Sequence, residues 1–160
     1  MPTDLIVNNN IFAYPDDGDP PGWGADATGW AVEVTDVLQT LAGTNDITET
    51  IFTLTNNTSS PSNITALSFN PSTVRSATVE YSIYILTSST ERAEAGTLKL
   101  VYKNGGPIGA KWSIGNVFFG DDCGIVFSVT DAGQVQYTST NIAGTGYSGV
   151  IHFTATVTLQ

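Results

Sequence analysis

The sequence predicts a mainly β protein: an antiparallel β-sandwich of jelly-roll type with about eight strands, one amphipathic helix and an extended N-terminal arm. From residue 47 onward, apolar and polar residues alternate in short runs that are separated by turn residues. No helical patterns alternate with these runs, which excludes a parallel βαβ sheet. The chain has 23 Thr and 16 Gly in 160 residues and only 12% charged residues, a composition typical of sheet surfaces.

The alternating runs also predict which side chains face the core. The longest run, residues 73–87, has two distinct faces, and its inward set is expected to be Val79, Tyr81, Ile83 and Ile85. The inward set of the last run, residues 150–159, is expected to be Ile151, Phe153, Ala155, Val157 and Leu159. The other runs expected to form strands are 47–55, 64–69, 96–103, 111–119, 125–129 and 134–138.

One segment, residues 26–42, has helical periodicity. Its apolar residues recur at helical spacings and are Trp30, Val34, Val37, Leu38 and Leu41. Asp26 or Thr28 can cap its N-terminus, and Gly43 follows its end. Its polar face is acidic, so we expect the apolar stripe to pack on the sheet rather than to enter a membrane. We therefore assign residues 26–160 to a single sandwich domain that includes this helix.

Residues 1–25 are expected to form the extended arm. Pro15, Pro20 and Pro21 exclude a regular helix in this segment. The arm carries apolar residues that one small sandwich need not cover, so we expect it to dock on a neighbouring subunit or particle protein. A strap across its own domain and a solvated tail are the alternatives. The residues expected at the interface are Leu5, Ile6, Phe12, Tyr14 and Trp23.

The charge of the chain excludes two classes of partner. Five Lys and Arg residues stand against fifteen Asp and Glu residues, for a net charge of −10. Nucleic-acid binding requires cations along the phosphate backbone, and anionic membrane surfaces require basic clusters. We therefore expect neither nucleic acid nor a membrane as partner. Residues 1–10 show no secretory signal, and the longest apolar runs are too short to span a bilayer.

The residue types that catalysis requires are scarce. His152 is the only histidine, and its parity in the last strand places it opposite the apolar set. Cys123 is the only cysteine, which excludes a disulfide framework. It follows Asp121 and Asp122, whose carboxylates raise a thiol pKa and disfavour a reactive thiolate. We therefore predict no catalytic residue, no cofactor and no enzyme activity, and we interpret paired carboxylates as solvated turns.

Two further groups of residues are candidates for binding sites. Asp16, Asp17 and Asp19 supply oxygen ligands of the kind that calcium prefers, but they lack the spacing of a helix-loop-helix calcium site. We therefore predict no resident metal. Tyr147 lies beside the Gly-rich loop 143–149 and is the expected receptor contact. Tyr84 and Tyr137 are expected to meet a sugar, another subunit or the sheet core.

Several motifs resemble a known kind of module. The stretch YPDDGDPPGWGADATGWAVEVTDVL at residues 14–38 resembles the opening of a module in structural proteins of tailed bacteriophages. The motifs STVRSA at 72–77 running into VEYSIY at 79–84, and RAEAG at 92–96, are similar to parts of the same module. GQVQYTSTN at 133–141, followed by GYSG at 146–149, completes the pattern. The resemblance extends from about residue 12 to residue 158.

This resemblance implies a non-enzymatic structural component of a tailed-phage virion that is assembled in the host cytoplasm. Within that class we favour a capsid decoration protein or a short fibre module, exposed on the particle surface and attached to other capsid or tail proteins through residues 1–25. Family analogy also implies a homo-oligomer, a trimer, and brings no catalytic residues. The alternative is a tail-fibre module that binds a host receptor or surface glycan, with Tyr147 at the contact.

Overall fold

The computed structural model of the chain describes residues 5–7, 10–12, 28–35, 45–105, 109 and 111–160. These residues belong to two compact units, Met1–Thr44 and Asn45–Gln160. In the first unit, β1 (Leu5–Val7) pairs antiparallel with β2 (Asn10–Phe12). The sequence patterns do not predict this hairpin, because three residues are too few for a two-residue periodicity to show.

The first unit also contains the helix, which is described over residues 28–35. The rest of the expected helix, at 26–27 and 36–42, lies outside the described residues, as do residues 13–25 of the expected arm. Trp30 belongs to the described part, and 39% of its side chain is exposed. The partner of the helix therefore stays a prediction. No helix in the described part of the chain is long and apolar enough to cross a membrane.

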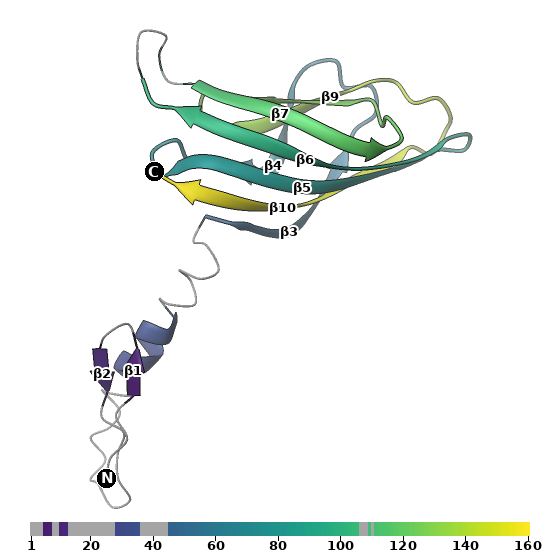
Figure 1. The fold of residues 1–160 in the computed structure, drawn as a ribbon. Helices are drawn as coiled ribbons and strands as arrows, with labels where there is room; N and C mark the ends of the chain where they lie inside the picture. Colours follow the sequence, from purple (N-terminus) through teal and green to yellow (C-terminus); the bar gives the residue numbers. More distant parts are fainter. Residues whose placement is uncertain (1–4, 8–9, 13–27, 36–44, 106–108, 110) are drawn as a thin grey trace, which may run out of the picture. The chain divides into compact units, whose positions relative to one another are not determined.

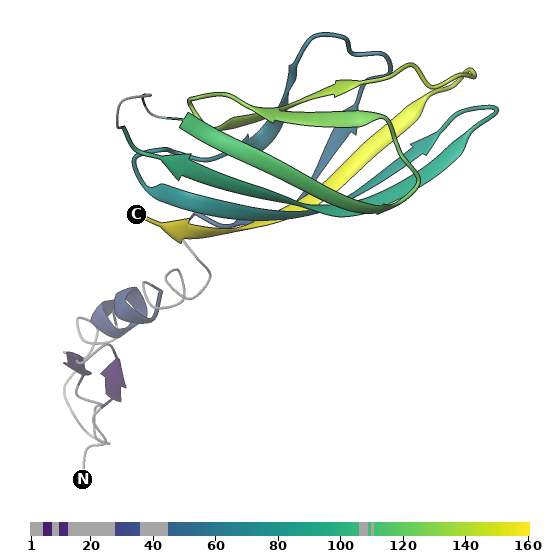
Figure 2. The same cartoon turned by 45° about the horizontal axis from the view of Figure 1, so that its top comes forward.

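The second unit is a sandwich of two antiparallel sheets (Figures 1 and 2). The larger sheet has the order β3-β10-β5-β6-β7, and the smaller one has the order β4-β9-β8. Their strands are β3 (Ile47–Leu54), β4 (Ser62–Ser68), β5 (Val74–Leu86), β6 (Glu91–Lys103), β7 (Lys111–Gly120), β8 (Ile125–Val129), β9 (Gln134–Ser139) and β10 (Ser148–Leu159). The predicted fold class is thus confirmed by the described strands.

The core lies where the inward side chains of the two sheets meet. All four inward residues predicted for β5 are buried, and Tyr81 packs edge-on against Phe127 of β8 with ring centroids 5.1 Å apart. The inward set of β10 is confirmed for Ile151, Phe153 and Ala155. The prediction for Leu159 is wrong, because the register with β5 shifts after Thr158 and leaves Leu159 52% exposed.

Candidate functional site

The outward face of the five-stranded sheet is where exposed aromatic, apolar and titratable side chains gather. Strand register determines which residues are neighbours there, because alternate residues share a face. His152 of β10 is opposite Ile51 of β3 on one side and Ser82 of β5 on the other. Ser82 is opposite Ala95 of β6, which is opposite Phe119 of β7. One row of side chains therefore crosses all five strands.

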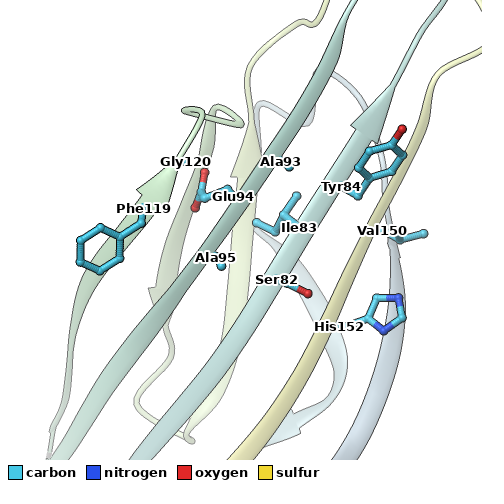
Figure 3. A pocket seen from close by; sticks show the side chains of 10 residues that line it. All are labelled: Ser82, Ile83, Tyr84, Ala93, Glu94, Ala95, Phe119, Gly120, Val150 and His152. Atoms are coloured by element: carbon cyan, nitrogen blue, oxygen red, sulfur yellow. The ribbon is translucent and has the colours of Figure 1, made fainter.

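A shallow depression, here called the outer trough, lies along this row and has a volume of about 530 Å³. Figure 3 shows Phe119 projecting from β7 on one side and Tyr84 and His152 on the other, with the short side chains of Ala93 and Ala95 between them. The depression exists because small residues separate these large ones. The remaining lining residues are Ser82, Ile83, Glu94, Gly120 and Val150.

Two aromatic side chains give the outer trough its character. Phe119 is 77% exposed and Tyr84 is 42% exposed. The Tyr84 hydroxyl donates a hydrogen bond to Glu91 Oε1 at 2.9 Å, which holds the ring in position. This hydrogen bond, together with burial and the charge of Glu91, raises the pKa of Tyr84. The hydroxyl therefore stays protonated at neutral pH. With two aromatic rings and an uncharged hydroxyl, the trough presents an apolar surface with few polar groups.

His152 forms the polar end of the outer trough. Its Nδ1 lies 3.5 Å from Glu49 Oε1, and it also lines a smaller hollow of about 210 Å³ that includes Glu49 and Glu80. Although Ser82 is opposite His152, no hydrogen bond joins these two residues in the described structure. Both belong to interior strands, whose backbone N–H groups are paired within the sheet and cannot form an oxyanion hole.

The arm residues predicted from the sequence belong to the first unit or lie outside the described residues. Leu5, Ile6 and Phe12 belong to the β1–β2 hairpin, and Tyr14 and Trp23 lie outside the described residues. None of the described groups of His, Cys, Asp and Glu has three members placed to hold a metal ion. The calcium candidates Asp16, Asp17 and Asp19 also lie outside the described residues.

Tyr147, the expected receptor contact, is half-buried and packs against the core. Its hydroxyl is buried and has no hydrogen-bond partner among the described residues. A Cβ atom at Gly149 would overlap that hydroxyl, so the ring folds back over the glycine. Burial, with smaller contributions from Tyr137 and Cys123, raises the pKa of Tyr147. The phenol group is therefore turned into the domain, and a receptor role for Tyr147 stays a prediction.

Cys123 is fully buried, and its pKa is raised to about 12. Burial is the largest cause and the charge of Glu94 is the second, while Asp121 and Asp122 contribute less. The predicted direction is confirmed, but the main reason is tertiary. Of the other two tyrosines, Tyr137 is a core residue, while Tyr84 reaches the surface. Sequence reasoning missed Phe119, whose one signal was the unbroken apolar run of residues 117–119 at a strand end.

Comparisons with known proteins gave two similar solved structures, while no family model and no curated protein match the sequence. The tailspike protein of Acinetobacter phage vB_ApiP_P1 is 14% identical with a TM-score of 0.45, over 71% of this chain and 22% of that one. The tailspike protein of Acinetobacter baumannii phage AM24 is 13% identical with a TM-score of 0.35, over 72% of this chain and 27% of that one. With TM-scores below 0.5, these likenesses carry no argument about this chain.

Proposed function

We propose that the chain is a structural component of a tailed-phage virion, exposed on the particle surface as a capsid decoration protein or a short fibre module. The observation that carries the proposal is the outward face of the five-stranded sheet, where Ile51, Val117 and Phe119 are each more than 60% exposed. Exposed apolar side chains on a rigid sheet are typical of protein contact surfaces. The motifs at residues 14–38 and 133–149 supply the assignment to a virion.

We further propose that residues 1–25 attach the protein to other capsid or tail proteins, and that it assembles as a homo-oligomer, a trimer by family analogy. Prolines in this segment preset the backbone, which lowers the entropy lost on docking. The net charge of −10 supports the assignment, because a particle component must not collect nucleic acid from a lysing cell.

Mass spectrometry of purified particles tests this function. We expect the protein in the particle, where a high copy number indicates decoration and a handful of copies indicates a fibre. Deletion of residues 1–20 is expected to abolish particle attachment while the thermal unfolding of the sandwich is retained, because the two units are separately compact. Absence of the protein from particles would refute the virion role. If the truncated protein occupied its sites on the particle as fully as the complete chain does, attachment through the arm would be refuted.

A second function, binding of a host-surface glycan, is favoured by the outer trough. Tyr84 and Phe119 offer faces on which a sugar ring can stack, and the side chains of Ser82 and His152 can form hydrogen bonds with its hydroxyl groups. We propose this contact in place of Tyr147, because the Tyr147 hydroxyl is buried.

Binding of the purified protein to host envelope glycans tests this alternative. We expect Tyr84→Ala and Phe119→Ala each to weaken binding about tenfold, because buried aromatic contacts dominate small interfaces. Val126→Ala is the matched control, since Val126 is also exposed but belongs to the three-stranded sheet. Failure of the wild-type protein to bind at any concentration would remove the alternative. If Tyr147→Ala lost binding while Tyr84→Ala and Phe119→Ala did not, the glycan site would be assigned to the loop at 143–149 and not to the outer trough.

A further inference from the structure

Strand β7 is a sheet edge whose C-terminal end is apolar on both faces. Among the described strands of its sheet, it pairs only with β6, and that register is unbroken from Lys111 to Gly120. Val117, Phe118 and Phe119 are 64%, 41% and 77% exposed. Because successive residues point to opposite faces, neither face of this end is covered within the described unit. Such an edge is a template for pairing with another strand.

The opposite edge strand, β3, is protected in ways that β7 is not. The pairing of β3 with β10 is interrupted by a register shift between Phe153 and Ala155. Two acidic side chains also lie at this edge. Glu49 belongs to β3, and Asp46 Oδ1 accepts a hydrogen bond from the backbone N–H of Val157 at 2.8 Å. Bulges and charges are the usual means of preventing edge pairing. In β7, residues 112–120 contain no charged side chain, so this edge is open to a partner.

The charges at the two ends of β7 indicate a second copy of the same strand as that partner. β7 begins at Lys111, which pairs with Lys103, and it is followed directly by Asp121 and Asp122. Neither Lys111 nor Asp121 forms an ion pair within the described part of the chain, although Asp121 Oδ2 accepts a hydrogen bond from the Ala93 backbone N–H at 3.0 Å. Antiparallel pairing of two β7 strands places each cationic end near the acidic end of the other copy. Parallel pairing places like charges together, which is unfavourable.

An open space beside Gly115 on the outward face indicates which residues of the two β7 strands lie opposite each other. No described atom lies within 4 Å of the position that a Cβ of Gly115 would occupy. Gly115 and Val117 also line a hollow of about 480 Å³ with Thr97 and Lys99. When Val117 is opposite itself, Phe119 of each copy is opposite Gly115 of the other copy and on the same face. An aromatic ring placed over an edge glycine is a known stabilising arrangement.

We propose that β7 pairs antiparallel with β7 of a second copy, with Val117 at the two-fold axis. The two five-stranded sheets then form one continuous sheet, and the apolar residues 117–119 of both copies are covered by the partner. This self-association stands whether or not the protein is a virion component. A negative result in the particle experiment above therefore leaves the β7 pairing standing, and a negative result in the experiments below leaves the virion role standing.

Cysteine cross-linking of the full chain tests the register. Residues opposite each other in antiparallel strands have Cα atoms about 4.5–5.5 Å apart, within the range of a disulfide. We expect Val117→Cys to form covalent dimers under mild oxidation on a non-reducing gel. Phe119→Cys is expected not to do so, because four residues separate the two copies of position 119 along the strands, about 13 Å. The native Cys123 is fully buried and does not compete.

Ile51→Cys and Val126→Cys are the matched controls, since their exposed fractions of 62% and 63% nearly equal that of Val117. Equal cross-linking of Val117→Cys and these controls would overturn the proposal. Efficient cross-linking of Phe119→Cys but not of Val117→Cys would overturn the register on which it rests.

Sedimentation equilibrium tests the association without a disulfide. We expect the wild-type chain to form two-fold dimers, which differ from the trimer that family analogy implies. We expect Val117→Lys to raise the dissociation constant at least about tenfold, because two like charges would meet at the axis. Ile51→Lys, on the other edge, is expected to leave it unchanged. A wild-type chain that is monomeric at all concentrations would overturn the proposal. A trimer in which Val117→Cys does not cross-link would overturn it too. The wild-type mass requires no variant, so this outcome does not depend on a variant that folds.

Discussion

Glu94→Ala is expected to lower the free energy of unfolding by about 1–3 kcal/mol, because it leaves the buried Cys123 backbone N–H without an acceptor and leaves the Tyr81 hydroxyl with Asn116 Oδ1, 3.0 Å away, as its remaining acceptor. Glu94 is 4% exposed. Its Oε1 accepts a hydrogen bond from the Tyr81 hydroxyl at 2.8 Å, and its Oε2 accepts one from the Cys123 backbone N–H at 3.0 Å. Burial, the hydrogen bond to Glu94 and its charge raise the pKa of Tyr81 well above the ordinary value, so the hydroxyl remains a donor.

Glu91→Ala is the matched control for Glu94→Ala. Glu91 lies on the same strand but on the opposite face, and it accepts a hydrogen bond from the Tyr84 hydroxyl at 2.9 Å in an exposed position. Water replaces this acceptor when it is removed, so we expect no measurable loss of stability. Urea denaturation of the three proteins measures the difference. Equal losses in the two variants would contradict the assignment of Glu94 to a buried network.

Gly133→Ala is expected to cost at least about 3 kcal/mol of unfolding free energy, because a left-handed backbone and a steric overlap add up. Gly133 has φ +87° in the turn between β8 and β9. Its Cβ would overlap the carbonyl oxygen of Phe69 and lie 3.0 Å from Nε1 of the buried Trp112. Phe69 cannot move away easily, because its backbone N–H donates to the Gly133 carbonyl at 3.0 Å.

Gly146→Ala separates these two causes. Gly146 has φ +66°, and no described atom lies within 4 Å of its added Cβ. Only the backbone penalty applies there, so the expected loss is about 1–2 kcal/mol. Thermal or urea denaturation of both variants gives the comparison. If Gly133→Ala lost no more unfolding free energy than Gly146→Ala, the overlap with the Phe69 carbonyl oxygen would be relieved by a shift that costs no stability.

Local patterns predicted most of the sandwich, because burial on one face of a strand leaves a two-residue periodicity in the sequence. The inward sets of β5 and most of β10 were found in this way, and so was the outward position of His152. The β1–β2 hairpin was missed because its strands are too short to carry a period. The outward position of Leu159 was missed because a register shift is produced by the pairing of strands and not by either strand alone.

The candidate site depends on tertiary contacts more than the individual strands do. Tyr147 beside a Gly-rich loop suggested an exposed ring, but Gly149 leaves space for the ring to fold back onto the core. The sequence analysis assigned Phe118 and Phe119 no role, and their exposure follows from the position of β7 at a sheet edge. No sequence pattern near these two residues indicates that β7 lies at the edge of its sheet.

The sequence by itself determined the mainly β sandwich, most of its inward faces, the scarcity of catalytic residue types and the acidic charge. These properties depend on composition and on neighbours a few residues away, so they can be read along the chain. Only the tertiary structure decided which strand lies at each sheet edge, where the outer trough forms and why burial is the main cause of the raised pKa of Cys123. Strand order joins segments that are far apart in the sequence, such as Phe119, Tyr84 and His152, and local patterns do not encode that order.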